Sequence, residues 1–370
     1  MNFKRFSVLI SLFLLVLFSC KTSNNKEIES KNASQNLCNH SRWLKIYDNG
    51  EIVTIKISNP DNPKQVFVFE GKLNSNQKVA NSSKKINLPV AKMAVLSSTH
   101  IGMLNELNAI NTIAAISNAK YVYQSEVKRG VKSGQIISLG DEGQISIDKL
   151  LQSKTKVMIY SAFSGEFSQQ KKFDKLGIVS IPNYDWRETT PLGKADWLLL
   201  FGYLTGKQEQ AKERIERLNT LYSQGIIAGK KIKNKELFLL GNQMGDYWYA
   251  PAGESYQAIL LKDAGINYLY ANTKGTGSLA LPMEQVIQDS KKATIWLNPG
   301  FETKKEILLS NPKAAFLSVF QKGEIYCYSA NMNNFWENST IQPHWFLHDL
   351  QEIKANTATN ENLYFYKSVE

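Results

Sequence analysis

The sequence contains few of the residues on which most enzymes and metal sites depend. Its 370 residues include only three Cys and four His. That is too few for a disulfide framework, a Cys-rich zinc site or a His-based metal or acid–base centre. The motifs G-x-G-x-x-G, Walker A, H-E-x-x-H and G-x-S-x-G are also missing. We therefore expect a protein that is not an enzyme and that uses neither a cofactor nor a resident metal.

Arginine is scarce although the chain is basic. The formal net charge is +11, but only six of the 44 basic residues are Arg and the others are Lys. A surface that reads phosphates or bases is expected to use the bidentate fork of the guanidinium group. The lysines are instead spread along the chain among Asn, Gln and Glu. We therefore expect a lysine-covered surface and no nucleic-acid partner.

Long apolar runs are confined to the first twenty residues. Lys4 and Arg5 precede an apolar run at 6–18, which is too short to cross a hydrocarbon core of about 30 Å but fits the core of a signal peptide. The run ends at Leu17-Phe18-Ser19-Cys20, which resembles the bacterial lipoprotein processing box. That resemblance implies a lipoprotein signal peptide at 1–19 and a lipidated Cys20. An ordinary secretory signal is the alternative.

The rest of the chain predicts an extension followed by two similar α/β lobes. Residues 20–90 are polar and broken by Asn, Ser and Pro, so we expect a tether and an N-terminal β extension with one hairpin at 43–57. In 91–206 and again in 230–370, short apolar strands alternate with helices in the same order. This alternation predicts a mostly parallel sheet flanked by helices in each lobe. The expected strands are 91–96, 113–116, 157–160 and 178–181, then 236–240, 267–270, 294–297 and 324–328.

A long helix is predicted between the two lobes, at 207–229. Apolar residues recur there at a spacing of three to four, which gives one apolar helical face; they are Ala211, Ile215, Leu218, Tyr222 and Ile226. The twenty-one residues of the periodic segment 207–227, at 1.5 Å each, reach roughly 32 Å, about the width of one lobe. We expect a rigid strut that joins both lobes, and a surface helix packed on one lobe is the alternative.

Several segments, taken together and in this order, resemble the iron-chelate and vitamin B12 class of periplasmic binding proteins, the helix-bridged solute receptors of ABC importers. The resemblance covers about residues 90–367, and its last two segments fit a lipoprotein branch of that family. It implies a class III periplasmic-binding-protein-like fold with one ligand in the cleft between the lobes. The segments are Leu96-Ser97-Ser98-Thr99-His100, 139–150, 190–197, 248–256, 281–286, Asn334-Phe335-Trp336-Glu337 and Leu363-Tyr364-Phe365-Tyr366.

The resemblance also implies partners. A receptor of this class captures an iron–siderophore, haem or cobalamin-type chelate and, as a monomer, delivers it to an ABC permease with its ATPase. An acidic residue on each lobe docks onto Arg pockets of the permease, and those positions correspond to Asp148 and Glu284. Solvated acids near a helix N-terminus are the alternative for both. The expected location is the cell envelope, facing the periplasm, with a lipid anchor as the sole membrane attachment.

Aromatic residues dominate the loops expected to border the cleft, and such side chains hold a flat or bulky organic chelate through buried area and stacking. His100 lies at a strand-to-helix turn, and Arg187 beside Trp186 offers a fork for an anionic group or a stacking partner. The cluster 247–249 is the strongest candidate. The predicted ligand-binding residues are His100, Tyr121, Phe163, Trp186, Arg187, Tyr247, Trp248, Tyr249, Trp296, Phe335 and Trp336.

Two other functions and one pairing stay open on the sequence. A metal-dependent hydrolase on the same scaffold would use His100, His344 and His348, of which the last two are spaced i, i+4 in a helix that is more simply a packed one. A receptor for bare metal ions is disfavoured by the shortage of His and thiols. The sequence leaves open whether Cys38 and Cys327 pair, which chelate binds, which permease receives it, and which membrane holds the anchor.

Overall fold

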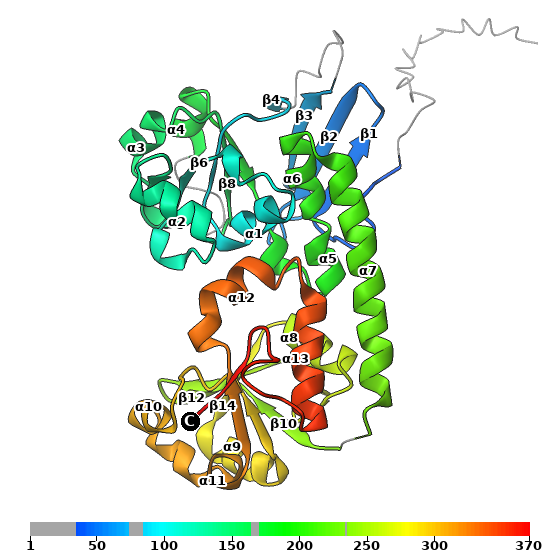
Figure 1. Cartoon of the computed structure of the whole chain (residues 1–370), viewed down its shortest axis with the longest axis vertical. Coiled ribbons are helices and arrows are strands. Elements are labelled where there is room, and N and C mark those ends of the chain that lie inside the picture. Colours follow the sequence, from blue (N-terminus) through cyan, green and yellow to red (C-terminus); the bar gives the residue numbers. More distant parts are fainter. Residues whose placement is uncertain (1–34, 74–83, 164–169, 234) are drawn as a thin grey trace, which may run out of the picture. The chain divides into compact units, whose positions relative to one another are not determined.

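We describe the protein from a computed structural model, which describes residues 35–73, 84–163, 170–233 and 235–370 (Figure 1). The described residues belong to one compact unit, Ser34–Glu370. The predicted signal peptide at 1–19 and Cys20 lie outside the described residues. Within the ranges that the structure describes, no helix combines the length and the apolar character needed to cross a bilayer.

The N-terminal lobe is built on a five-stranded, wholly parallel sheet in the order β7-β6-β5-β8-β9. Its strands are short and almost entirely buried, as expected where helices cover both faces of a parallel sheet. The strands are β5 (Met93–Val95), β6 (Ile113–Ile116), β7 (Ile137–Ser138), β8 (Val157–Tyr160) and β9 (Val179–Pro182). The helices are α1 (Ser98–Glu106), α2 (Ser125–Lys132), α3 (Ile147–Gln152), α4 (Gln170–Lys175), α5 (Pro191–Ala195) and α6 (Leu198–Thr205).

The C-terminal lobe repeats this arrangement with an added small sheet. Its main sheet has the order β13-β10-β15-β16-β17, in which only β17 is antiparallel, and β11-β12-β14 form a separate antiparallel sheet. The main strands are β10 (Leu237–Leu240), β13 (Asn267–Tyr268), β15 (Ile295–Leu297), β16 (Glu324–Cys327) and β17 (Lys367–Ser368); the others are β11 (Asn242–Met244), β12 (Tyr247–Pro251) and β14 (Ser278–Pro282). The helices are α8 (Tyr256–Asp263), α9 (Met283–Asp289), α10 (Lys304–Ser310), α11 (Ser318–Lys322), α12 (Met332–Asn338) and α13 (Pro343–Ala355).

The two lobes share one topology, which confirms the fold predicted from the sequence. The predicted strand pairs are β5 with β10, β6 with β13, β8 with β15 and β9 with β16. In space the first set runs β6-β5-β8-β9 and the second runs β13-β10-β15-β16, so each strand takes the same place in its sheet. The sequence did not predict the small sheet β11-β12-β14, nor the strands β7 and β17 at the sheet edges.

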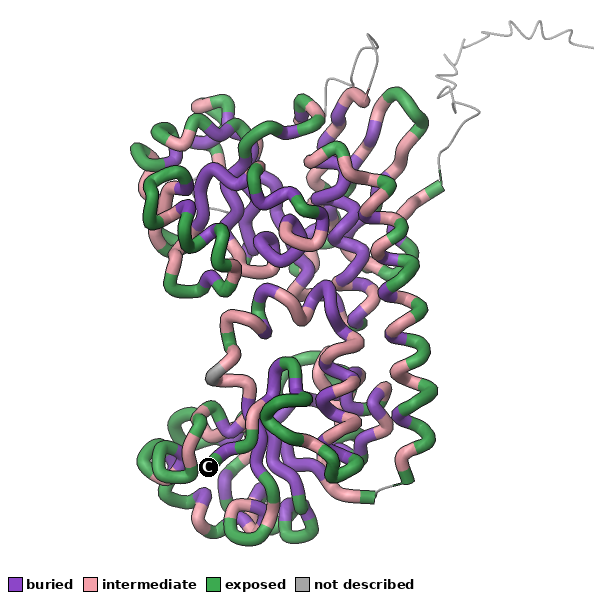
Figure 2. Tube along the Cα trace, in the orientation of Figure 1, coloured by how far each residue is buried: buried purple, intermediate pink, exposed green. Residues whose placement is uncertain are grey.

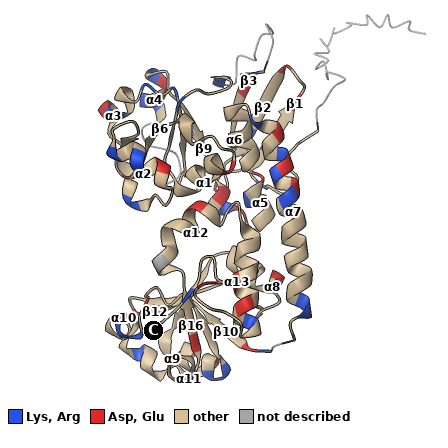
Figure 3. Cartoon of the chain, viewed as in Figure 1, with Lys and Arg blue, Asp and Glu red and all other residues tan. Residues whose placement is uncertain are grey.

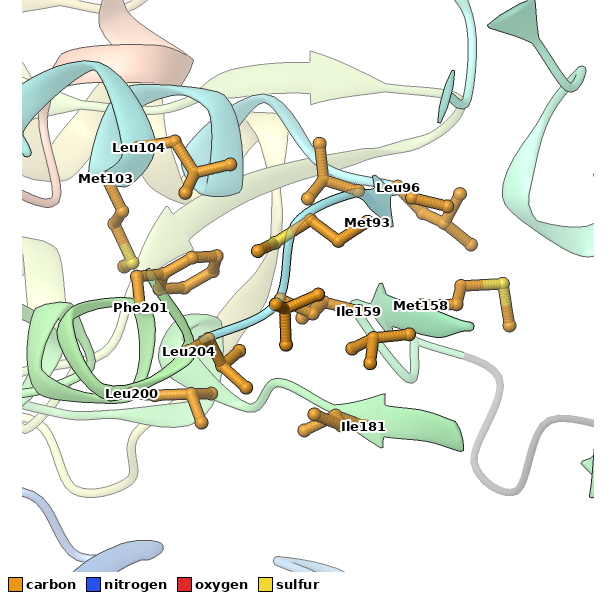
Figure 4. Packing of buried hydrophobic residues seen from close by; sticks show 14 of the residues in the cluster. Met93, Leu96, Met103, Leu104, Met158, Ile159, Ile181, Leu200, Phe201 and Leu204 are labelled. Carbon is orange, nitrogen blue, oxygen red and sulfur yellow. The ribbon is translucent and has the colours of Figure 1, made fainter. Parts of the chain in front are cut away.

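Each lobe has its own hydrophobic core, and Figure 2 shows the buried residues gathered in the two sheets and the helices on them. In the N-terminal core, side chains from β5, β8 and β9 meet side chains from α1 and α6, among them Met93, Ile159, Met103 and Phe201 (Figure 4). Cys38 belongs to this first core and Cys327 to the second, and both are free thiols.

The N-terminal extension forms a four-stranded sheet that is part of the first core. Only its first hairpin, β1 (Leu44–Asp48) and β2 (Ile52–Ser58), was predicted; β3 (Val66–Lys72) and β4 (Lys84–Asn87) complete the order β1-β2-β3-β4. Two buried carboxylates from the first lobe hold its start. Asp196 accepts hydrogen bonds from the backbone N–H groups of His40 and Ser41 at 2.6 and 2.8 Å, and Glu188 accepts that of Arg42 at 3.1 Å.

The helix α7 (Gln208–Lys231) joins the two lobes and packs on both (Figure 1). Its 24 residues extend about 36 Å. Ala211 and Ile215 belong to the first core and Tyr222 to the second, where its hydroxyl donates to Asp263 Oδ2 at 2.7 Å. The helix therefore links the two cores, and the alternative of a helix packed on one lobe alone is excluded.

One buried carboxylate holds residues 364–366, the segment that leads into the last strand, β17. Asp349, on α13, is completely buried, and it accepts the backbone N–H groups of Tyr364, Phe365 and Tyr366 at 2.8, 2.7 and 3.1 Å. Tyr364 also stacks on Trp345 with ring centroids 4.6 Å apart and planes 7° from parallel. Phe365 and Tyr366 of this segment pack against Phe335 of α12 and Phe346 of α13.

Replacing this carboxylate tests its contribution to stability. Asp349→Ala leaves three buried N–H groups without their acceptor, so we expect the free energy of unfolding in urea to fall by about 3 kcal/mol. Asp246→Ala, in the exposed turn between β11 and β12, is the control and should change it by less than about 0.5 kcal/mol. Equal effects of the two substitutions would show that the buried carboxylate does not hold the segment.

Candidate functional site

A cavity of about 500 Å³ lies between the two lobes and is lined by residues of both. This volume falls within the range of about 300–1,000 Å³ that is usual for small-molecule sites. In open α/β sheets such sites form beyond the carboxyl ends of the strands, where the loops of neighbouring strands converge. The lining residues of the N-terminal lobe follow that rule strand by strand.

The N-terminal wall of the cavity comes from the residues that follow four parallel strands. Leu96–Thr99 come after β5, Ser117 after β6, Ser161 after β8 and Asp185 after β9. The Ser97 side chain also accepts the N–H of Thr99 and so begins α1 at this point. Because strand ends at one sheet edge lie close together, these polar groups converge on one space.

The ionisable groups of this wall are mainly acidic. Glu142 accepts hydrogen bonds from the backbone N–H groups of Ser161 and Ala162 at 3.0 and 3.1 Å. Burial raises the pKa of its carboxyl, although these two bonds act to lower it. Burial likewise raises the pKa of Asp185, and the ammonium of Lys194 opposes that shift. Burial lowers the pKa of Lys194, whose Nζ lies 3.8 Å from the centroid of the Tyr256 ring of the other lobe.

Five of the predicted ligand-binding residues line the cavity together: Tyr121, Phe163, Trp186, Phe335 and Trp336. Phe163 and Trp186 contact each other with centroids 4.7 Å apart, and the Trp186 indole N–H donates to Ser161 O at 2.6 Å. From the other lobe, Phe335 and Trp336 begin an aromatic wall on α12. The five therefore bring aromatic surface to both sides of one space.

The aromatic wall on α12 is fixed from behind by further rings. Tyr328, which follows β16, stacks on Phe335 with centroids 4.1 Å apart and planes 4° from parallel. Trp336 lies edge-on to the same two rings, at 6.5 Å from Tyr328 and 5.2 Å from Phe335. Ring packing of this kind restricts side-chain rotation, so this side of the cavity is preformed.

The cluster 247–249 and Trp296 lie outside the cavity. Residues 247–249 begin β12, where successive side chains point to opposite faces. Trp248 is buried in the second core, 5.3 Å from Trp296, and their indole N–H groups donate to the carbonyls of Leu240 and Gly241. Tyr247 and Tyr249 point the other way and are 48% and 38% exposed. The prediction treated this strand as a loop at the cleft.

His100 and Arg187 also lie outside the lining of the cavity. His100 is completely buried on α1 beside Phe201, with ring centroids 5.6 Å apart, and burial lowers its pKa to about 3. Its imidazole is therefore neutral and belongs to the core. Arg187 stacks on Trp186 from outside the cavity and forms an ion pair with Asp61 at 2.8 Å.

The three histidines of the hydrolase alternative do not form one centre. His344 and His348 lie on α13, as the spacing predicted, whereas His100 lies in the first core. His348 faces Asp349 and Glu352, which are within 3.7 and 3.9 Å. Across the described ranges, no group of three or more His, Cys, Asp or Glu is placed to hold a metal ion.

Asp148 and Glu284 occupy equivalent places in the two lobes. Each is an exposed residue in the first turn of its helix, α3 or α9, and each helix leads into the matching central strand, β8 or β15. Glu284 pairs with Lys313 at 2.6 Å, and this contact lowers the pKa of its carboxyl.

The sequence analysis missed all four charged lining residues, which are Asp141, Glu142, Asp185 and Lys194. Asp141 and Glu142 occupy the Gly-rich loop after β7, and Asp185 follows β9. For Asp185, the position directly after a predicted parallel strand was the signal that would have identified it. Asp141 and Glu142 follow β7, which the sequence did not predict, so no such signal pointed to them. Lys194 lies on α5 and has no such signal, because its placement depends on how α5 meets the other lobe.

The two lobes touch directly where α12 packs against α1. Glu337, on α12, is 2% exposed, and its carboxylate accepts the backbone N–H groups of Tyr123 and Gln124. Gly102 of α1 lies so close to the Glu337 carbonyl that a methyl group there would overlap it. Next to this contact, Gln342 donates to Glu106 at 2.9 Å.

Burial raises the pKa of Glu337 from 4.5 to about 7, although its two N–H partners act in the opposite direction. Between these values the native protein retains a proton that the unfolded chain has lost. The contribution of Glu337 to stability is therefore complete below pH 4.5 and is lost as pH rises through about 7.

We expect the free energy of unfolding of the wild type, relative to Glu337→Gln, to fall by about 2 kcal/mol between pH 5 and pH 8. Urea unfolding of both proteins across this range measures the difference. A wild type that gains stability relative to the variant as pH rises would show that the N–H bonds outweigh burial at this carboxyl.

One family model and one curated relative match most of the chain. The model of the family described as periplasmic binding protein matches residues 93–331, which include both lobes. The chain is 24% identical over 331 residues to an uncharacterized lipoprotein of Methanocaldococcus jannaschii, a match that covers 85% of this chain and 76% of that protein.

Solved structures with the same fold share little sequence with the chain. The periplasmic haem-binding protein HutB of Vibrio cholerae has a TM-score of 0.57 at 14% identity and covers 73% of this chain and 100% of its own. The petrobactin-binding protein YclQ of Bacillus subtilis has 0.57 at 12%, with 83% and 99% covered. The vitamin B12-binding protein BtuF of Vibrio cholerae has 0.53 at 12%, with 73% and 98% covered.

Proposed function

The chain belongs to the periplasmic binding protein family, whose members are solute receptors and not enzymes, and from that premise we propose that it is the receptor of an ABC importer for a metal chelate. The chelate is of the iron–siderophore, haem or cobalamin type and is held between the two lobes. The observation that carries this proposal is the cavity of about 500 Å³ with aromatic side chains on both of its sides.

The physical properties of the cavity suit such a ligand. A chelate presents a large, mostly organic surface around a metal that the chelator itself coordinates, so buried area and stacking can supply much of its binding energy. Tyr121, Phe163 and Trp186 supply that surface from one lobe, and Phe335 and Trp336 supply it from the other. The structural relatives HutB, YclQ and BtuF bind haem, petrobactin and vitamin B12, and this supports the same class of ligand.

Binding is expected with little movement of the lobes. The helix α7 is part of both cores, and the contact between α1 and α12 ties the lobes at a second place. A preformed site loses less entropy on binding than one that has to close over its ligand.

The proposal includes attachment to the cell envelope through lipid. It is supported by the lipoprotein-like segment that ends at Cys20 and by a relative that is itself a lipoprotein. Delivery is to an ABC permease with its ATPase, to which the receptor, as a monomer, docks through Asp148 and Glu284. Their equivalent positions on the two lobes support this assignment, because a partner with two related halves offers two matching basic pockets.

Truncating one aromatic residue of the cavity tests the site. Trp336→Ala removes a ring that a stacked chelate would contact, and we expect its affinity for the best-binding chelate to fall at least tenfold, since aromatic contacts of this kind contribute about 1.4 kcal/mol or more. Tyr249→Ala is the control, because Tyr249 is similarly exposed but lies outside the cavity.

Fluorescence titration with ferric siderophores, haem and cobalamin measures both variants. Unchanged affinity in Trp336→Ala, or equal losses in the two variants, would place the ligand elsewhere. The same titration of Trp248→Phe tests the original prediction for that buried residue, which we now expect to leave the affinity unchanged.

Charge reversal tests the docking acids. Asp148→Lys combined with Glu284→Lys should abolish transport of the chelate by cells and leave its affinity for the purified receptor unchanged, because both residues are exposed and do not line the cavity. Glu126→Lys combined with Asp246→Lys reverses one exposed acid on each lobe at other positions and should leave transport intact. Transport that survives the first pair of changes would contradict the docking role.

A further inference from the structure

The ionisable residues of the cavity have an excess of negative charge. Among the described lining residues are three carboxylates, Asp141, Glu142 and Asp185, against a single ammonium, Lys194, and no Arg or His. This excess has the opposite sign to the net charge of the whole chain, which has 44 basic and 33 acidic residues. Figure 3 shows the basic residues distributed over the outer surfaces of both lobes. The acidity of the cavity is therefore a local property.

No cation of the described lining residues is free to neutralise an anionic guest. The negative charge of Asp185 stabilises the ammonium form of Lys194. The Lys194 Nζ also lies over the Tyr256 ring. Arg187, the nearest guanidinium along the chain, is outside the cavity and paired with Asp61. Since Asp185 and Lys194 offset each other, the excess negative charge of the lining residues comes from Asp141 and Glu142. The exposed ammonium of Lys120, outside the lining, interacts with Asp141.

Buried acceptor atoms on the same wall lack partners. Asp185 is 3% exposed, and its Oδ2 has no hydrogen-bond partner in the described part of the chain. Ser161 is equally buried, and its Oγ makes no hydrogen bond of regular geometry there, although the hydroxyl lies near the Glu142 carboxyl and lowers its pKa. A buried carboxylate oxygen without a donor is costly, and the cost is removed when a bound molecule donates to it. This wall therefore offers buried acceptor positions to hydrogen-bond donors of a guest.

We infer that the cavity selects a neutral or cationic chelate that presents N–H or O–H donors, such as amide groups, towards Asp185 and Ser161. An anionic guest, such as a carboxylate-bearing macrocycle or a tris-catecholate, would place like charges beside Asp141 and Glu142 in a partly desolvated space. The facing rings of Phe163, Trp186 and Trp336 favour a cation further. This inference rests on the proposed function for the location of the guest.

A panel of chelates that differ in charge tests the inference. The cationic probes are ferrioxamine B and aquocobalamin, the neutral probe is ferrichrome, and the anionic probes are ferric enterobactin and haem. Ferrioxamine B and ferric enterobactin both surround ferric iron with oxygen atoms but differ in net charge. The difference between their affinities therefore reports the effect of charge. We expect at least one cationic or neutral probe to bind about tenfold or more tightly than either anionic probe. Added salt should weaken binding of the cationic probes.

Two substitutions identify the residues responsible. Asp141→Asn, at an exposed lining residue, should weaken the cationic probes about threefold, leave ferrichrome unchanged and strengthen the anionic probes. Asp185→Asn keeps the shape of the side chain and should weaken the best probe about tenfold through loss of a charge-assisted bond. Asp246→Asn, an exposed acid outside the cavity, is the matched control and should change no affinity. If Asp185→Asn does not fold, Asp141→Asn alone decides.

The outcomes separate the inference from the proposed function. Tighter binding of ferric enterobactin or haem than of every cationic and neutral probe overturns the charge selection and leaves the chelate receptor in place. Equal affinities across the panel, unaffected by Asp141→Asn, also overturn it. If no probe binds, the proposed chelate function fails, and the inference fails with it.

Discussion

The structure depends on one constraint, which is that two complete hydrophobic cores are joined by a single stiff helix and do not merge. Each lobe buries its own sheet, and α7 contributes Ala211 and Ile215 to one core and Tyr222 to the other. Because neither core needs the facing surface of the other lobe, polar groups at the strand ends remain available to a guest. The contact of Glu337 with the backbone of Tyr123 and Gln124, just before α2, holds the lobes together without filling the cavity.

The fold was readable from the sequence because periodicity and order carry it. Alternating short apolar strands and helices, repeated in one order, predicted the two sheets, and the apolar spacing of Ala211 to Ile226 predicted α7. The additional strands were not predictable in the same way. β11 (Asn242–Met244) is polar, and β17 (Lys367–Ser368) is two residues long, so neither shows an alternation that distinguishes it from a loop. Their pairing is fixed by tertiary contacts.

The site was only partly readable, because aromatic side chains serve cores and cavities alike. Trp186 and Trp336 do line the cavity, whereas Trp248 is fully buried in the second core. Sequence type does not separate these cases; the side of the strand or helix on which the ring falls does. The acidic residues Glu142 and Asp185 were missed for another reason. Their role follows from convergence of strand ends, which requires the strand order in space.

The central claim is that the guest sits between the lobes, and an anomalous difference map tests it most directly. Crystals of the receptor with a bound iron or cobalt chelate would locate the metal without reference to any assumed pose. The account predicts one peak in the cavity, between the rings of Phe163 and Trp186 on one side and Trp336 on the other. A peak on the outer surface of either lobe, with the cavity free of chelate, would contradict it.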